Sequence, residues 1–153
     1  MKIDKRLEEL GINLPKASAP IAAYVQTVKT GSLIFTSGQI PFVNNKLEYV
    51  GKFGDNLTIE DGIKAAEICT LNGLSAIKQE IGDLDKVKRI VKVTGYLNCA
   101  KDFSENSKIT EGASQLLIKI FGERGYHTRT SIGVSNMPMR AALAIELIVE
   151  VID

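Results

Sequence analysis

Several residue patterns that carry familiar chemistry are missing from this sequence. It contains 1 histidine, 2 cysteines and no tryptophan among 153 residues. Cys69 and Cys99 lack the short spacing of zinc ligands, so we predict no metal site. The glycine loop that cradles phosphate and the nucleophile elbow of serine hydrolases are also missing. The sequence therefore contains none of the standard catalytic signatures.

A strong net charge and a long hydrophobic run are missing too. The 19 Lys and Arg residues nearly balance 18 Asp and Glu residues, which gives a formal charge of +1. A nearly neutral chain has no global basic field to attract nucleic acid or an anionic membrane. The longest apolar run is interrupted by Glu146 and Glu150 and is too short to span a bilayer. The N-terminal residues also lack the apolar core of a signal peptide, so we expect a reduced, cytoplasmic protein. From the charge and the short apolar runs we expect no nucleic-acid or membrane partner.

Length and hydrophobic periodicity predict a single α+β domain over residues 1–153. A short accessory helix within residues 1–14 is expected to end at Gly11. The other predicted elements are, in chain order, a hairpin of strands 23–28 and 33–37, a helix 58–82, a strand 88–99, a helix 103–121, a strand that contains Arg129, and a strand 141–152. Residues 38–56 are predicted to form a loop with at most a short edge strand near 47–50.

Capping signals predict where the two long helices begin. Thr58 and Asp61 have the form of a capping box, with Asp in place of the usual Glu. The second helix is expected to start at a cap formed by Asp102 or Ser104. Gly82 follows the first helix and Gly122 follows the second, which predicts both C-terminal ends.

Strand alternation predicts which side chains share a face. In strand 88–99, one face is predicted to hold Val91, Val93, Leu97 and Cys99, and the other Ile90, Lys92, Thr94 and Tyr96. Strand 141–152 is apolar on both faces. Two long helices can cover only one face of such a sheet, so a second copy of the chain is the economical cover for the other. We therefore expect a homo-oligomer.

Arg129 is the residue that most needs an explanation, because it places a charge inside a strand. Alternation puts it on a face of small polar side chains that includes Ser131. A permanently protonated, planar guanidinium can hold a carboxylate or a phosphate through two parallel hydrogen bonds. The alternative is a structural ion pair, which is the more common role of a lone arginine in a strand.

Several other residues have two interpretations each. His127 lies two residues before Arg129 and is either a site residue or a solvated residue at a strand end. Asn72 and Gly73 lie within a helix against propensity, which indicates packing first and a functional role for Asn72 second. Tyr126 and Phe103 are predicted to be core or interface aromatics.

Five stretches carry a resemblance to a known family. They are Ala-Tyr-Val-Gln at 23–26, Leu-Ile-Phe-Thr-Ser-Gly-Gln-Ile-Pro at 33–41, Leu-Asn-Gly-Leu at 71–74, Asp102-Phe103, and Arg129 followed by Pro138. Over residues 15–153 the chain resembles the Rid family, also called YjgF/YER057c/UK114 and historically labelled endoribonuclease L-PSP. Its N-terminal helix is similar to that of the longer branch. The resemblance implies a mixed β-sheet backed by two long helices on one face, the chorismate mutase-like fold, and a homotrimer with three clefts between subunits.

The resemblance also implies a function. Family members with known activity hydrolyse 2-imino acids and their enamine tautomers to 2-oxo acids and ammonia. By this resemblance Arg129 binds the substrate carboxylate and is the candidate catalytic residue, Tyr24 of the neighbouring subunit forms a cleft wall, and Ser37, Gly38 and Ser131 contact the ligand. A protonated imine is already electrophilic, so holding it beside water can supply much of the acceleration without a metal or an organic cofactor.

The sequence departs from the family pattern at three positions. Ala144 replaces a glutamate that helps to position the water, Ser131 replaces a frequent cysteine, and Lys101 replaces an asparagine. Glu146 lies on the face of Ala144 but about 7 Å further along the strand. Three hypotheses follow: an imine or enamine deaminase, a non-catalytic trimer that binds a small carboxylate, and a ribonuclease. The near-neutral charge and the lack of an obvious acid–base pair argue against the ribonuclease.

Overall fold

The computed structural model describes residues 2–20 and 22–153. In chain order the elements are α1 (Ile3–Glu9), β1 (Thr27–Thr30), β2 (Leu33–Thr36), β3 (Phe42–Val43), β4 (Lys46–Leu47), α2 (Ile59–Ile81), η1 (Leu84–Lys86), β5 (Val87–Asn98), α3 (Asn106–Phe121), η2 (Gly122–Gly125), β6 (Thr128–Val134), η3 (Pro138–Arg140) and β7 (Leu143–Val151). No helix among the described residues is both long enough and apolar enough to cross a membrane.

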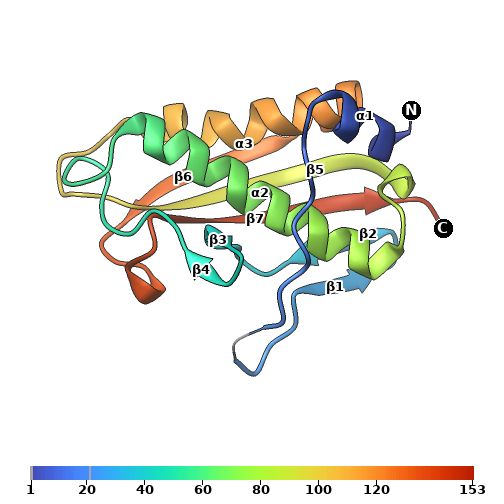
Figure 1. Cartoon of the computed structure of the whole chain (residues 1–153), viewed down its shortest axis with the longest axis horizontal. Helices are drawn as coiled ribbons and strands as arrows, with labels where there is room; N and C mark the ends of the chain where they lie inside the picture. The colour runs from blue at the N-terminus through green and yellow to red at the C-terminus, as the bar shows by residue number, and fades with distance from the viewer. Residues whose placement is uncertain (1, 21) are drawn as a thin grey trace.

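Five strands form one sheet in the order β1-β2-β7-β5-β6. β5 and β6 are parallel, and the other neighbouring strands are antiparallel. α2 and α3 lie side by side across one face of this sheet (Figure 1). β3 and β4 form a separate two-stranded hairpin. The prediction of a mixed sheet backed by two long helices, with a short helix at the N-terminus, is confirmed.

The local signals predicted for α2 are present in the structure. Thr58 Oγ1 accepts the Asp61 N–H at 3.1 Å, and Asp61 Oδ2 accepts the Thr58 N–H at 2.9 Å. This capping box satisfies two backbone donors that the helix itself leaves unpaired. Gly82 ends the helix with φ of +85°, a conformation that favours glycine. Both ends of α2 are therefore determined by nearby residues in the sequence.

Two predicted boundaries are wrong. β1 begins at Thr27 instead of Ala23, because the chain bends there and the Tyr24 N–H donates to Ala22 O at 2.8 Å instead of to a neighbouring strand. α3 begins at Asn106 instead of Phe103, and neither predicted residue caps it. Phe103 lies in the connection before the helix and packs against Phe53, with ring centroids 6.0 Å apart.

The predicted faces of β5 are wrong at Ile90. The pairing of β5 with β7 shifts register between Ile90 and Lys92, as in a β-bulge. A bulge adds one residue and inverts the alternation on one side of it. Ile90 is therefore in the core with Val93 and Leu97 instead of opposite them, and Val91 is only partly buried.

The sheet face opposite α2 and α3 carries apolar side chains. Ile34 is fully buried on the helix side, so Phe35, the next residue of β2, points to the opposite face. Val28 pairs with Phe35, and Phe35 pairs with Ile148, which places all three side chains on that face. Val28 is 53% exposed and Phe35 is 41% exposed. A second copy of the chain as the cover for this face stays a prediction.

Candidate functional site

A cavity of about 500 Å³ brings together segments that are far apart in the sequence. Its described lining comes from the segment before β1, the connection from β2 to β3, β3 and the turn that follows it, α2, the residues before and within η3, and β7. The lining residues are Ser18, Ala19, Tyr24, Gln26, Gly38, Gln39, Ile40, Phe42, Asn45, Asn72, Met137, Pro138 and Ala144. Two predicted site residues, Tyr24 and Gly38, thus share one cavity with Ala144.

Backbone pairing positions the predicted turn beside β7. The Gln39 N–H donates to Ile145 O at 2.8 Å, and the Ile145 N–H donates to Gln39 O at 3.0 Å. Ser37 Oγ donates to Val25 O at 2.6 Å. This hydrogen bond holds the segment that contains Tyr24 against the end of β2. The hydroxyl of Ser37 is therefore engaged with the backbone, and Gly38 is the member of the predicted Ser37–Gly38 pair that lines the cavity.

Amide side chains supply the polar part of the cavity wall. Asn72 Nδ2 donates to Ile40 O at 3.2 Å and to Phe42 O at 3.1 Å. Gln39 Nε2 donates to Gln26 Oε1 at 2.7 Å and to Ser37 O at 3.1 Å. Backbone carbonyls only accept hydrogen bonds, so these contacts fix which way both amides are turned. Asn72 therefore holds the β2–β3 connection and also lines the cavity, and its position inside α2 has a structural reason.

Arg129 is not part of this cavity wall. It lies on the edge strand β6 and faces α3, where its Nη1 donates to Ser114 Oγ at 3.1 Å and lies 3.4 Å from Glu111 Oε2. Its side chain is 24% exposed. Ser131, two residues further along the same face, has its hydroxyl 2.5 Å from that of Thr110 on α3. Within one chain, Arg129 and Ser131 are together, and Tyr24 and Gly38 are together elsewhere.

His127 belongs to the group around Arg129. Its Nε2 lies 2.8 Å from Ser114 Oγ, and its Nδ1 lies 2.6 Å from Gly125 O. Burial lowers the pKa of His127 below its ordinary value of 6.5. The sequence analysis missed Ser114 and Glu111, although both lie within four residues of Thr110 and so on neighbouring positions of the helix surface. The sequence analysis assigned neither residue a role.

The cavity wall has no acid among its described residues, at position 144, where the resemblance led us to expect one, or elsewhere. Ala144 is 7% exposed and pairs with Tyr96 of β5. Glu146, two residues further along β7, accepts a hydrogen bond from Tyr96 Oη at 2.9 Å. This hydrogen bond to the carboxylate raises the pKa of Tyr96. The Glu146 carboxylate is thus already hydrogen-bonded, on the sheet face opposite the helices. Lys101 lies exposed in the turn after β5.

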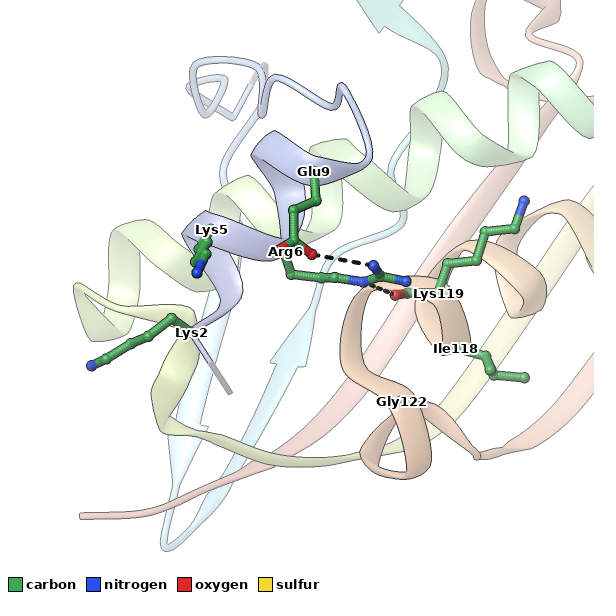
Figure 2. Close-up of a pocket in the computed structure, with 7 residues that line it drawn as sticks. All are labelled: Lys2, Lys5, Arg6, Glu9, Ile118, Lys119 and Gly122. Carbon is green, nitrogen blue, oxygen red and sulfur yellow. Dashed lines mark hydrogen bonds and ion pairs between the residues drawn. The ribbon is translucent and has the colours of Figure 1, made fainter.

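A second, smaller hollow of about 270 Å³ lies between α1 and the end of α3 (Figure 2). Arg6 crosses it, donating from Nε to Lys119 O at 2.8 Å and from Nη1 to Glu9 Oε2 at 3.4 Å. Figure 2 shows the ammonium groups of Lys2 and Lys119 pointing in different directions, and Lys2 pairs with Asp85 at 3.0 Å. This hollow is best explained by the anchoring of α1. Across residues 2–20 and 22–153, no three His, Cys, Asp or Glu side chains are grouped closely enough to hold a metal ion.

Comparisons with known proteins bear on these sites. The model of a family described as "YjgF/chorismate mutase-like, putative endoribonuclease" matches residues 4–151. Protein TCP17 of Trypanosoma cruzi is 38% identical over 150 residues, covering 97% of this chain and 94% of the relative. The crystal structure of a "putative endoribonuclease" from Shewanella oneidensis MR-1 has a TM-score of 0.95 at 34% identity, covering 99% of this chain and 100% of that one.

A more distant relative is named for a chemical activity. TdcF of Escherichia coli K12, named "putative reactive intermediate deaminase", is 29% identical over 140 residues, covering 90% of this chain and 93% of the relative. A crystal structure of E. coli TdcF with bound serine has a TM-score of 0.62 at 28% identity, covering 90% of this chain and 94% of that one.

Proposed function

The chain belongs to the YjgF/chorismate mutase-like family, and from this membership we propose that it binds small 2-imino and 2-oxo acids in a cleft between subunits and hydrolyses the imines. The observation that carries the proposal is the cavity that joins Tyr24 and Gly38. Its described lining includes no charged residue. A ligand carboxylate needs a cationic partner, and Arg129 of a second copy is the group that we propose completes the site.

The relatives give this proposal its chemical class. TdcF is named for the deamination of reactive intermediates and has been crystallised with serine, a small amino acid. A 2-imino acid has the same carboxylate and a similar size. The uncharged amide lining of the cavity suits the polar but neutral part of such a ligand.

The proposed reaction requires little machinery from the protein. The guanidinium of Arg129 holds the carboxylate, and Tyr24 of the other subunit packs against the body of the ligand. Water adds to the carbon of the protonated imine, and one proton passes from the added oxygen to the nitrogen. The carbinolamine then expels ammonia and gives up its hydroxyl proton to it, which forms the 2-oxo acid and ammonium. Fixing both reactants beside each other lowers the entropic part of the barrier. No step in this scheme uses a metal or an organic cofactor.

Ala144 favours a second candidate, in which the protein binds the carboxylate without hydrolysing an imine. An acid–base group typically contributes about 10²–10⁴-fold to a rate. Ala144 supplies no such group, and Glu146 is hydrogen-bonded to Tyr96. The ribonuclease function in the family description remains the third candidate, and the near-neutral chain favours it least.

A turnover assay separates the first two candidates. An amino acid oxidase generates 2-imino acids in situ, and the release of ammonia is followed with and without the protein. We expect the protein to accelerate ammonia release, with no change after exhaustive chelation. Pyruvate binding without any acceleration would leave the non-catalytic candidate. A loss of activity on chelation that zinc or manganese restores would contradict the metal-independent scheme.

Introducing an acid at position 144 tests whether the lack of an acid there limits the proposed reaction. Ala144 lines the cavity, so a longer side chain at this position can extend into free volume. We expect Ala144→Glu to raise the rate of imine hydrolysis roughly tenfold or more, because a carboxylate can accept a proton from the attacking water. Ala144→Gln is the matched control, since it has the same shape without the charge. Equal rates in the two variants would show that filling the cavity, and not the acid, changes the rate.

A further inference from the structure

A series of hydrogen bonds beside Arg129 has no part in the proposed reaction. It runs from Gly125 O to His127, then to Ser114 Oγ, and then to the Arg129 guanidinium, with distances of 2.6, 2.8 and 3.1 Å. Gly125 lies in η2, His127 immediately before β6, Ser114 in α3 and Arg129 in β6, so tertiary packing holds these groups together.

Hydrogen-bonding rules fix the protons along this series. Gly125 O can only accept, so His127 Nδ1 carries a proton when the ring is neutral. Nε2 then has a lone pair and accepts from the Ser114 hydroxyl. Arg129 can only donate, so Ser114 Oγ accepts from it. Ser114 is 6% exposed, which gives it few other partners. The orientation of the guanidinium is thus set by Ser114, and that of Ser114 by His127.

Protonation of His127 changes its contact with Ser114 and the charge beside Arg129. Burial and the charge of Arg129 lower the pKa of His127, while its hydrogen bond to Gly125 and the charge of Glu111 oppose that shift. The ring is therefore neutral at neutral pH. When pH falls through that pKa, Nε2 becomes a donor to Ser114 Oγ and the serine proton must turn elsewhere. A second positive charge then stands beside Arg129, which favours a bound anion.

We propose that Ser114 and His127 are positioning residues for Arg129 and make the binding of carboxylates at Arg129 dependent on pH. This inference rests on the proposed function, since it assumes that Arg129 binds the ligand carboxylate. The charged groups that face His127 among the described residues are Arg129 on β6 and Glu111 on α3. Glu111 pairs with Arg129 in the absence of ligand, so a bound carboxylate takes over its role as the nearby anion.

The first test observes His127 directly by NMR, because it is the single histidine of the chain. Nitrogen-15 NMR at about pH 8 should show a neutral ring protonated at Nδ1. Saturation with pyruvate should raise the pKa of His127, because a ligand that binds better to the protonated ring must stabilise it by reciprocal linkage. Arg129→Gln should raise the pKa without ligand and abolish the further rise with pyruvate. A proton on Nε2, or an unchanged pKa with pyruvate bound, would overturn the inference.

The second test follows pyruvate affinity by calorimetry from about pH 5 to about pH 8. Pyruvate stays ionised over this range, so a change in affinity reports on the protein. Wild-type affinity should rise as pH falls through the pKa of His127, and His127→Gln should remove this dependence. Ser114→Ala should weaken binding about tenfold at the upper pH, because it removes a hydrogen bond to a charged group. Ser107→Ala, at an exposed position of the same helix, is the matched control.

The outcomes separate this inference from the proposed function. Pyruvate binding that is lost in Arg129→Gln but is unaffected by pH, Ser114→Ala and His127→Gln would keep the carboxylate site and reject the positioning role. No pyruvate binding by the wild type at any pH would reject the proposed function and this inference together. If a variant fails to fold, the NMR measurement on the wild type still tests the inference.

Discussion

At the scale of single residues, the guanidinium of Arg129 has a competitor on α3. Glu111 Oε2 lies 3.4 Å from Arg129 Nη1, and the Glu111 side chain is 49% exposed. An exposed ion pair at this distance contributes little, about 0–1 kcal/mol. A ligand carboxylate that makes two parallel hydrogen bonds can therefore displace it. The structural ion pair predicted as the alternative role of Arg129 is present, and it is compatible with a binding role.

Replacing Arg129 by lysine tests the planar guanidinium separately from the charge. We expect Arg129→Lys to weaken pyruvate binding about tenfold or more, because a charge-assisted hydrogen bond contributes about 1.5–3 kcal/mol. Titration calorimetry measures the difference. Arg89→Lys is the matched control, since Arg89 is an exposed arginine on β5. Equal affinities of Arg129→Lys and the wild type would reject Arg129 as the carboxylate-binding residue.

Some residue-level features could be predicted from the sequence and others could not. Arg129 and Ser131 share a face because side chains alternate with a period of two residues along a strand. This alternation involves only neighbouring residues, so it could be predicted. Ser114 and Glu111 could not be assigned to Arg129, because they reach it through the packing of α3 on the sheet. The register of α3 against β6 is a tertiary property that hydrophobic periodicity does not contain.

At the scale of elements, the close approach of α2 and α3 sets the position of Ser114 and Glu111. A Cβ added to Gly112 of α3 would lie 2.7 Å from the backbone oxygen of Ile63 on α2. Contacts this short force something to move, and a backbone atom moves less easily than the end of a side chain. Glycine at position 112 thus lets the two helices lie at their observed separation.

Gly112→Ala is expected to destabilise the fold although alanine is the better helix former. Alanine gains about 1 kcal/mol of helix propensity, while forcing apart two packed helices costs about 1–3 kcal/mol. We expect a lower midpoint of urea unfolding and weaker pyruvate binding, because α3 also carries two contacts of Arg129. Ser107→Ala raises propensity on the same helix without this clash and should not lower the midpoint. An increased midpoint in Gly112→Ala would refute the packing role of Gly112.

Element boundaries were predictable where the signal is local. The capping box at Thr58 and the glycine stop at Gly82 involve residues within a few positions of each other, so both ends of α2 were predicted. The face of Ile90 was not, because the bulge in β5 is defined by its pairing with β7, where Ile90 lies opposite Val149, far away in the sequence. The start of α3 was missed because Phe103 packs against Phe53 instead of entering the helix.

At the scale of the whole molecule, the two halves of the proposed site lie apart in one chain. Tyr24 and Gly38 line the cavity, and Arg129 faces α3 outside it. The apolar sheet face that bears Val28 and Phe35 is open in the single chain. This open face was predictable from the sequence, because two long helices cover only one face of a sheet and the last strand is apolar on both faces. The order of the strands was not predictable in that way, because it depends on pairings between distant segments.

A homotrimer built on this open face would bury Phe35 and bring Arg129 of one copy to the cavity of the next, as we propose. A charge at position 35 costs little in an isolated chain, because Phe35 is 41% exposed there, but it would be buried without a partner in the assembly. If the wild type is the proposed trimer, Phe35→Asp should therefore convert it to monomers and abolish pyruvate binding while leaving the far-ultraviolet circular dichroism unchanged. Sedimentation equilibrium at micromolar concentration measures the mass, and Ser107→Asp on the outer surface of α3 is the control. A wild-type monomer, or a Phe35→Asp variant that keeps the wild-type mass, would reject this face as the interface and remove the reason for placing Arg129 and Tyr24 in one cleft.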